Sequence, residues 1–432
     1  MSNTHYDIAI VGAGPVGLAA ALALAQSPAG KSLKTALIES RPPRQAPTNG
    51  KFDTRVVAIN ESSRRLLDSL SPSSLTAGSL FNSPRICPYY TMEVWDTVGS
   101  GHVRFDCAEL HHDNLGHIVE QSVLMAALLD TLASTKNVDF LCPHTVLDIQ
   151  RTKPETKNQA ITLRLDANTL NKSAETIAPE TTDISADLLI AADGARSQVR
   201  EHLGFIHHIS DTGHTAIVAT IKTEHPHAYS ARQWFSTTGP LAFLPLQADA
   251  QTDAETGDAQ FVSIVWSQQH QRAEHLMALS DQDFCRELEL ASEHCLGSLQ
   301  LVSERIKAPL AQSHSDDYVQ AGVALLGDAA HAIHPLAGQG VNLGFSDVAA
   351  LVEELNRGHE KALPINHPSA LKRYQRRRKP ENRMAETAMT AFKTLFEREE
   401  LPLAVLRNQG MWVFNKAKGL KHTVIKRAMG LD

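Results

Sequence analysis

The sequence predicts an α/β protein in which a Rossmann-like dinucleotide-binding domain is joined to an antiparallel-sheet domain and to C-terminal helices. Three patterns predict this fold. Residues 6–11 (YDIAIV), 15–25 and 33–39 (LKTALIE) read as strand, helix and strand, which is a βαβ unit. Short apolar runs between residues 216 and 267 are typical of an antiparallel sheet. From Gly340 onward, almost every segment has helical spacing.

The other elements follow from local patterns. We expect a helix over 61–70, a hairpin over 89–106, a helix over 115–134, an exposed hairpin or loop over the polar stretch 151–186, and buried strands at 187–191 and 322–326. The antiparallel strands are expected at 216–223, 232–235, 241–246 and 261–267.

Composition excludes several classes of protein. The chain has 41 Lys and Arg against 48 Asp and Glu, a net charge of −7, so we expect no nucleic-acid partner. Its five cysteines include no C-x-x-C pair, which argues against a disulfide framework or zinc site and fits a reducing cytosol. The N-terminus leads directly into a strand, so we expect no secretion signal. The apolar run 16–25 is about ten residues, short of the roughly 20 that span a bilayer.

A glycine-rich turn follows the first strand. Gly12, Gly14 and Gly17 have the spacing G-x-G-x-x-G, and Glu39 ends the next strand. The first glycine allows the tight turn, the second lets a pyrophosphate approach the backbone, and the third lets helix and strand pack closely. The helix N-terminus then faces the phosphates and Glu39 the ribose hydroxyls. The alternative is a tight turn that binds nothing.

Two later strands end in an acidic residue beside a glycine. Asp193-Gly194 follows LLIAA, and Gly327-Asp328 follows VALL. A strand that ends in Asp-Gly is, taken alone, more often a simple turn. The second of these motifs continues through 329–340 (AAHAIHPLAGQG) into a helix, whose N-terminus favours a negatively charged ligand.

Together, GAGPVG, DG and GDAAHAIHPLAGQGVNLG resemble the three motifs of the class A flavoprotein monooxygenases, typified by para-hydroxybenzoate hydroxylase. Further segments are similar to the FAD-dependent hydroxylases of ubiquinone biosynthesis, most of all to those that hydroxylate a 2-polyprenylphenol. These segments are DTRVVAIN (53–60), MEVWD (92–96), LGHIVEQSVLMAALL (115–129), LAFLPL (241–246), YQRRRK (374–379) and KRAMGL (426–431). The resemblance spans nearly the whole chain and is weakest over 151–186.

The length of 432 residues is too great for one hydrophobic core, so we expect several domains. A discontinuous FAD-binding domain is expected to comprise residues 1–75, 107–200 and 305–350. The substrate domain is expected at 76–106 and 201–304, and a C-terminal helical region at 351–432.

The resemblance implies an FAD site built from all three motifs. The glycines of the first motif would hold the pyrophosphate, and Glu39 would bind the ribose. Asp328 would bind the ribityl chain, and Asp193 with Gly194 would brace the same region. Arg55 and Gln121 would contact the flavin. The implied cofactor-binding residues are Gly12, Gly14, Gly17, Glu39, Arg55, Gln121, Asp193, Asp328, Gly340 and Asn342. The alternative for Arg55 is a surface arginine, and for Gln121 a solvated helix face.

The loop around His334 and Pro335 is implied to lie beside the isoalloxazine ring, where the next helix N-terminus stabilises negative charge on the reduced flavin. His331 and His334 lie three residues apart, but no third ligand has suitable spacing, so we expect no metal.

The implied reaction uses FAD, oxygen and NAD(P)H. A flavin hydroperoxide would transfer one oxygen atom to the aromatic ring of a polyprenylphenol. A second G-x-G-x-x-G is absent from the sequence, which fits a reductant that docks transiently. No catalytic base is assigned, because a phenol activates its own ring. The alternatives are another flavin reaction on an aromatic or isoprenoid substrate, and a non-enzymatic flavin or nucleotide sensor.

The C-terminal segment 401–432 combines cations with apolar residues such as Trp412 and Phe414, against one acid, Asp432. The cations are Arg407, Lys416, Lys418, Lys421, Lys426 and Arg427. This composition favours a peripheral membrane helix, and the alternative is a helix that packs on the FAD domain. We expect a cytoplasmic protein that contacts the inner face of the membrane, a lipid-handling factor or other ubiquinone-biosynthesis proteins, and a homo-oligomer remains open.

Overall fold

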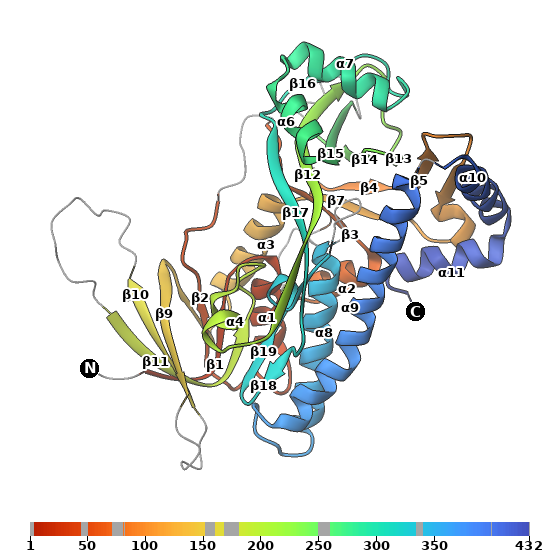
Figure 1. Ribbon diagram of the computed structural model, residues 1–432. Helices are drawn as coiled ribbons and strands as arrows, with labels where there is room; N and C mark the ends of the chain where they lie inside the picture. Colours follow the sequence, from red (N-terminus) through yellow and green to blue (C-terminus); the bar gives the residue numbers. More distant parts are fainter. Residues whose placement is uncertain are drawn as a thin grey trace.

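The computed structural model describes residues 4–44, 51–70, 81, 83–151, 160–167, 181–248, 260–333, 340–398 and 400–431 (Figure 1). Within these residues, eight strands form a first sheet in the order β18-β19-β11-β1-β2-β8, and β10 joins β11 to β9. Its strands are β1 (Thr4–Val11), β2 (Thr35–Ile38), β8 (Val138–Leu141), β9 (His144–Arg151), β10 (Ile161–Ala167), β11 (Thr181–Ala191), β18 (Val319–Gln320) and β19 (Val323–Leu325).

The centre of this sheet is parallel: β1 lies between β2 and β11, and β11 pairs with β19. Buried parallel strands read as continuous apolar runs, which is why Tyr6–Val11 and Leu188–Ala191 could be predicted as strands. Helix α1 (Pro15–Gln26) begins with proline at its first position and is buried from Gly17 to Ala25. It contacts α3 (Gln121–Ala133) and α8 (Gly340–His359), and the predicted βαβ unit is confirmed.

The second sheet has nine described strands in the order β20-β17-β12-β15-β14-β13-β5-β6, with β16 beside β12. They are β5 (Thr91–Asp96), β6 (His102–Asp106), β12 (His207–Thr223), β13 (Ser230–Ser236), β14 (Gly239–Leu246), β15 (Phe261–Gln269), β16 (Leu299–Leu301), β17 (Ile306–Ser315) and β20 (His331–Ala332). The predicted hairpin and antiparallel strands are confirmed. Figure 1 shows β12 and β17 running side by side along the length of the molecule. The boundaries of the domains stay a prediction.

Shorter elements complete the two ends. A small sheet joins β3 (Val56–Ile59), β7 (Gly116–Glu120) and β4 (Cys87–Tyr89). Helices α2 (Glu61–Leu70) and α4 (Gln198–His202) lie with the first sheet, and α6 (His270–Ala278) and α7 (Asp281–Ala291) contact strands of the second.

Two predictions about local structure were wrong. Residues 116–120 form β7 rather than the start of a helix, because a fully buried strand has no polar alternation to distinguish it from a buried helix. The stretch 151–186 is not wholly exposed. In its described part, Ile161, Leu163 and Leu165 alternate with polar residues and are buried, and β11 begins at Thr181 instead of residue 187.

Helices fill the C-terminal part, as predicted. After α8 come α9 (Pro368–Glu397), α10 (Leu401–Lys416) and α11 (Lys418–Ala428). Figure 1 shows α9 running from the first sheet toward the second, with α10 and α11 beyond its end. No helix within the described ranges is both long and apolar enough to cross a bilayer.

A buried ion pair fixes α10 to the β5–β6 hairpin. The side chains of Asp96 and Arg407 are 0% and 1% exposed, and Arg407 donates from Nε and Nη2 to the carboxylate at 2.6 and 2.9 Å. Asn408 also donates to Asp96, at 3.0 Å. Lys421 is buried too and pairs with Glu109 at 2.7 Å. The sequence interpretation counted Arg407 and Lys421 as surface cations, and this is wrong because each has an acidic partner in a distant, N-terminal part of the chain.

Removing Arg407 should destabilise this end of the protein. We expect Arg407→Met to lower the free energy of unfolding by about 3–5 kcal/mol, because Asp96 would remain buried without its counter-ion. Gln409→Met, on the exposed side of the same helix, should change it by less than about 0.5 kcal/mol. Urea unfolding of both variants tests this, and equal stabilities would contradict it.

Candidate functional site

The glycine-rich turn needs glycine at two positions for packing and has free space at the third. A Cβ on Gly12, whose φ is +99°, would lie 2.4 Å from the Ala192 carbonyl oxygen, and one on Gly17 would lie 1.9 Å from that of Gly12. A Cβ on Gly14 would meet no atom within 4 Å. Gly14 caps the N-terminus of α1, so the free space lies where unpaired helix amides favour an anion. This geometry fits a pyrophosphate.

Glu39 lies beside this turn. Its carboxylate accepts hydrogen bonds from the amides of Ala13 at 2.8 Å and Arg41 at 2.9 Å. The end of β2 therefore brings the acid to the glycine turn, as the βαβ interpretation predicted. A carboxylate has further lone pairs, so these two bonds leave it able to accept from a ribose hydroxyl.

The second and third motifs meet the first at the carboxyl edge of the parallel sheet. Ala192 donates its amide to Val11, and Leu326 donates to Ala191, at 2.8 and 2.9 Å. Ligands of open α/β sheets bind at this edge. Arg200, which sequence reasoning missed, ties the two later motifs together by donating to the carbonyls of Ala195 and Ala329 at 2.8 and 2.9 Å.

The two acids of these motifs differ in their surroundings. Asp193 accepts from the Val199 amide at 3.2 Å, while its Oδ1 is buried without a hydrogen-bond partner among the described residues. Asp328 has an exposed side chain that makes no hydrogen bond within the described part of the chain. Burial by the surrounding protein nevertheless raises the pKa of both carboxyls. Because its side chain is exposed, Asp328 can accept a hydrogen bond from a bound molecule.

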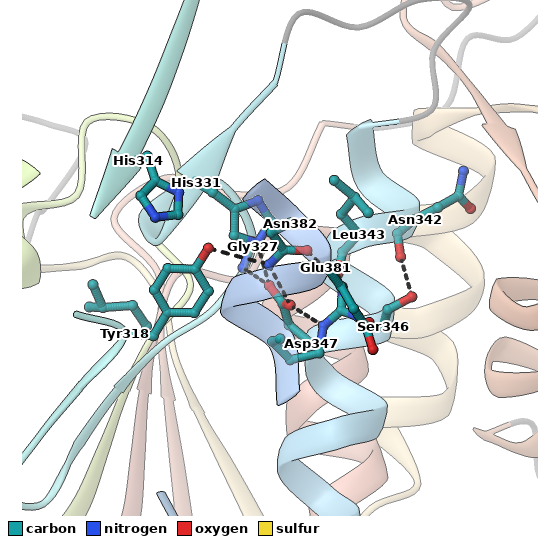
Figure 2. A network of polar contacts seen from close by, with 12 residues as sticks. His314, Tyr318, Gly327, His331, Asn342, Leu343, Ser346, Asp347, Glu381 and Asn382 are labelled. Carbon is teal, nitrogen blue, oxygen red and sulfur yellow. Dashed lines mark hydrogen bonds and ion pairs between the residues drawn. The ribbon is translucent and has the colours of Figure 1, made fainter. Parts of the chain in front are cut away.

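A buried carboxylate holds the third motif against the helices behind it. Figure 2 shows Asp347 of α8 beside Gly327 and His331. Asp347 accepts from the Gly327 amide at 3.0 Å, from His331 Nε2 at 2.7 Å and from Arg378 Nε at 2.7 Å. Burial opposes ionisation of Asp347, but His331 and Arg378 outweigh it and lower its pKa to about 2. His331 is thus engaged with a carboxylate. His334 and Pro335 lie outside the described residues.

The start of α8 packs closely on the first motif. A Cβ on Gly344 would lie 2.5 Å from Val16, and one on Gly340 would meet nothing within 4 Å. Asn342 was predicted to bind the cofactor. Its side chain accepts from the Asn60 amide at 3.1 Å and donates to the Ala58 carbonyl at 2.7 Å. These bonds connect α8 to the end of β3.

Arg55 and Gln121 come together although they are far apart in the sequence. The Gln121 amide donates to the Arg55 carbonyl at 2.9 Å, where β7 pairs with β3. Gln121 is half-buried, and the exposed Arg55 guanidinium makes no hydrogen bond or ion pair with the residues described. The guanidinium is therefore able to reach a ligand.

A cavity of about 580 Å³ lies between the second sheet, the start of α8 and the C-terminal helices. Apart from Asn60, Gln233, Asn342 and Arg407, the residues that line it are apolar, aromatic or glycine. Gln233 is 3% exposed as a whole residue and lies in the wall of this cavity. No sequence pattern indicated this cavity, because its wall combines strands and helices from both halves of the chain.

The free space beside Gly14 leads to a prediction about FAD binding. Gly14→Leu should leave the apoprotein folded, since the new side chain meets no protein atom within 4 Å and φ is −68°, an ordinary value. By blocking the pyrophosphate it should raise the FAD dissociation constant at least about 100-fold. Fluorescence titration measures this, with thermal unfolding of the apoprotein as the control. Unchanged affinity would remove Gly14 from the site.

Asp328 provides another prediction about FAD binding. Loss of one acceptor for a ribityl hydroxyl in Asp328→Ala should raise the FAD dissociation constant about 5- to 150-fold, equivalent to about 1–3 kcal/mol. The matched control is Asp130→Ala, an exposed acid near the far end of α3, which should bind FAD normally. If the two variants bind FAD equally well, Asp328 does not contact the cofactor.

Known proteins match this chain along its whole length. A family described as "FAD binding domain" matches residues 90–389. The chain is 33% identical to 3-demethoxyubiquinol 3-hydroxylase of Escherichia coli, covering 100% of both chains. It is 30% identical to ubiquinone hydroxylase UbiL of Rhodospirillum rubrum, covering 98% of this chain and 89% of the relative.

Solved structures share the fold. The p-nitrophenol 4-monooxygenase PnpA of Pseudomonas putida superposes with a TM-score of 0.74 at 17% identity, covering 99% of each chain. PqsL of Pseudomonas aeruginosa, in complex with 2-aminobenzoylacetate, gives a TM-score of 0.72 at 21% identity, covering 95% of this chain and 100% of that one. With these matches, the predicted para-hydroxybenzoate hydroxylase-like fold is confirmed, and the chain belongs to the FAD-dependent monooxygenases and, within them, to the hydroxylases of ubiquinone biosynthesis.

Proposed function

We propose that this enzyme hydroxylates the aromatic ring of a polyprenylphenol intermediate. The observation that carries this proposal is the apolar cavity of about 580 Å³. One end reaches Asn60 and Asn342, beside the helix start that is predicted to face the flavin ring. The rest of the wall is apolar and therefore suits a hydrocarbon chain. When such a chain binds, both the chain and the wall lose their contact with water, which is favourable.

The proposed FAD site uses the residues predicted from the sequence. Gly12, Gly14 and Gly17 hold the pyrophosphate and Glu39 the ribose, supported by the open cradle at Gly14. The remaining proposed contacts are Arg55, Gln121, Asp193, Asp328, and the backbone at Gly340 and Asn342. Bound at these residues, FAD would supply the activated oxygen for hydroxylation, with O2 as the oxygen source and NAD(P)H as the proposed transient reductant.

The chain's own task is then to orient the ring and exclude water. We assign the orienting role to Gln233, a largely buried residue that lines the cavity and whose side-chain amide can bond the phenol oxygen. Tyr89 also lines the cavity, and burial raises its pKa to about 12, so it stays protonated and neutral. The lining contains no carboxylate or histidine among the described residues, which fits a phenol that needs no strong base.

The main alternative is hydroxylation of a different ring position, on an intermediate from another step of ubiquinone biosynthesis. The Escherichia coli relative is named as a hydroxylase of 3-demethoxyubiquinol, so a substrate of that kind would also suit a prenylated pocket. Another flavin reaction on an aromatic or isoprenoid substrate is the broader alternative. Oxygen consumption that depends on a prenylphenol, with a product about 16 mass units heavier as expected for one inserted oxygen atom, would support hydroxylation. Reductant oxidation without such a product would refute it.

We also propose where in the cell the enzyme works. A polyprenylated substrate resides in lipid, so we propose a cytoplasmic enzyme that works at the inner face of the membrane, alone or with a lipid-handling factor or other ubiquinone-biosynthesis proteins. A homo-oligomer is compatible with this.

Filling the cavity should discriminate between substrates by chain length. Gly410 lines the cavity, and a Cβ there would meet no atom within 4 Å. We expect Gly410→Leu to lower kcat/KM for a long-chain prenylphenol at least about tenfold, because a steric clash of about 1.4 kcal/mol or more has that effect. A phenol with one prenyl unit should be much less affected.

The matched control is Gly419→Leu on α11, where a Cβ likewise meets nothing within 4 Å and which does not line the cavity. Both variants replace a helical glycine with a better helix former, so neither should lose stability. If the Gly410→Leu and Gly419→Leu variants have the same kcat/KM as each other for both substrates, the cavity does not hold the prenyl chain.

A further inference from the structure

We propose that α10 and α11 form a docking surface for an anionic lipid bilayer, with the mouth of the apolar cavity facing the lipid. That the enzyme needs membrane contact rests on the proposed function, whereas the docking surface is inferred from the exposed side chains of the two helices. The occupant of this surface is the bilayer.

Large apolar side chains are exposed along one stripe of α10. Val405, Leu406, Trp412 and Val413 are 55%, 64%, 59% and 56% exposed. Residues that are seven apart lie on the same face of a helix, so 405 aligns with 412 and 406 with 413. On α11, Leu420 and Val424 are four residues apart and 57% and 43% exposed. These six residues are called the C-terminal apolar face.

Exposed cations lie on the same two helices as the C-terminal apolar face. With Arg407 and Lys421 buried in ion pairs, the exposed cations are Lys416, Lys418, Lys426 and Arg427. Residues 401–431 contain no Asp or Glu. The Lys416 ammonium lies 3.5 Å from the centre of the Trp412 ring, so apolar and cationic groups share one surface. Cations beside exposed apolar groups complement anionic headgroups above hydrocarbon.

The cavity opens on this same surface. Leu406 and Val424 belong both to the cavity lining and to the C-terminal apolar face. Phe392 and Leu395 of α9 also line the cavity and are 48% and 37% exposed. Side chains that border the cavity and reach solvent mark its mouth. A bilayer at this mouth gives a prenylated molecule an apolar path into the protein without a passage through water.

Vesicle co-sedimentation of the full-length, FAD-loaded protein tests the surface. The probes are vesicles of phosphatidylcholine alone and of phosphatidylcholine mixed with phosphatidylglycerol. We expect binding to the mixed vesicles that falls as salt is raised, because exposed charges are screened. Lys416→Glu/Lys418→Glu should lower the partition coefficient at least about tenfold, and Trp412→Ser/Val413→Ser should also lower it. These side chains are exposed, so folding should be retained.

The matched control is Lys136→Glu/Lys361→Glu, the same charge change at exposed lysines outside the C-terminal helices, which should bind as the unchanged protein does. Absence of binding to anionic vesicles, equal loss in the control, or dependence on an added protein would overturn the proposal. Activity separates it from the proposed function. The Lys416 and Lys418 variant should lose activity toward a long-chain prenylphenol in vesicles and keep activity toward a short-chain phenol in solution. Vesicle binding without any phenol hydroxylation would refute the proposed function and leave the docking surface standing.

Discussion

The close approach of three backbone turns at the carboxyl edge of the parallel sheet is the constraint on which the rest of this structure depends. Gly17 packs against Gly12, Gly12 against Ala192, and Gly344 against Val16, at distances that no Cβ could occupy. These contacts bring the two aspartate motifs and the start of α8 to one edge, although they come from widely separated parts of the chain. Gly12, Gly17 and Gly344 have no room for a side chain of their own, whereas Gly14 faces open space that an anionic cofactor can fill.

A second constraint connects this edge to the apolar cavity. Asp347 is buried among Gly327, His331 and Arg378, so the third motif cannot move without disturbing α8 and α9 (Figure 2). At the start of the same helix, Asn342 bonds to Ala58 and Asn60 and lines the cavity. At the far end, Asp96 and Arg407 hold α10 over the second sheet. Polar interactions thus fix both ends of the largely apolar cavity, the Asn342 hydrogen bonds at one end and the Asp96–Arg407 ion pair at the other. The cavity can therefore keep its shape while it excludes water.

Most of the fold could be predicted from local sequence, since the βαβ unit, the antiparallel strands and the C-terminal helices each have their own hydrophobic period. The errors arose where the hydrophobic pattern does not distinguish a strand from a helix, or where the two residues of an ion pair are far apart in the sequence. Residues 116–120 are buried on both faces and could not be distinguished from a helix. Arg407 and Lys421 looked like surface cations because their partners, Asp96 and Glu109, lie in a remote part of the sequence. The glycine turn and both aspartate motifs could be found from spacing, whereas Arg200, Gln233 and Asp347 sit in ordinary strands and helices and carry no local signal.

We propose above all that the apolar cavity holds a prenylated phenol beside FAD for ring hydroxylation. The most direct measurement is mass analysis of the quinone intermediates that accumulate when the gene is deleted from its host. We expect a polyprenylphenol that lacks one ring hydroxyl to accumulate, and to disappear when the gene is restored. Accumulation of a demethoxyubiquinol would assign the enzyme to the later ring position. Normal ubiquinone levels with no new prenylated intermediate would contradict the account.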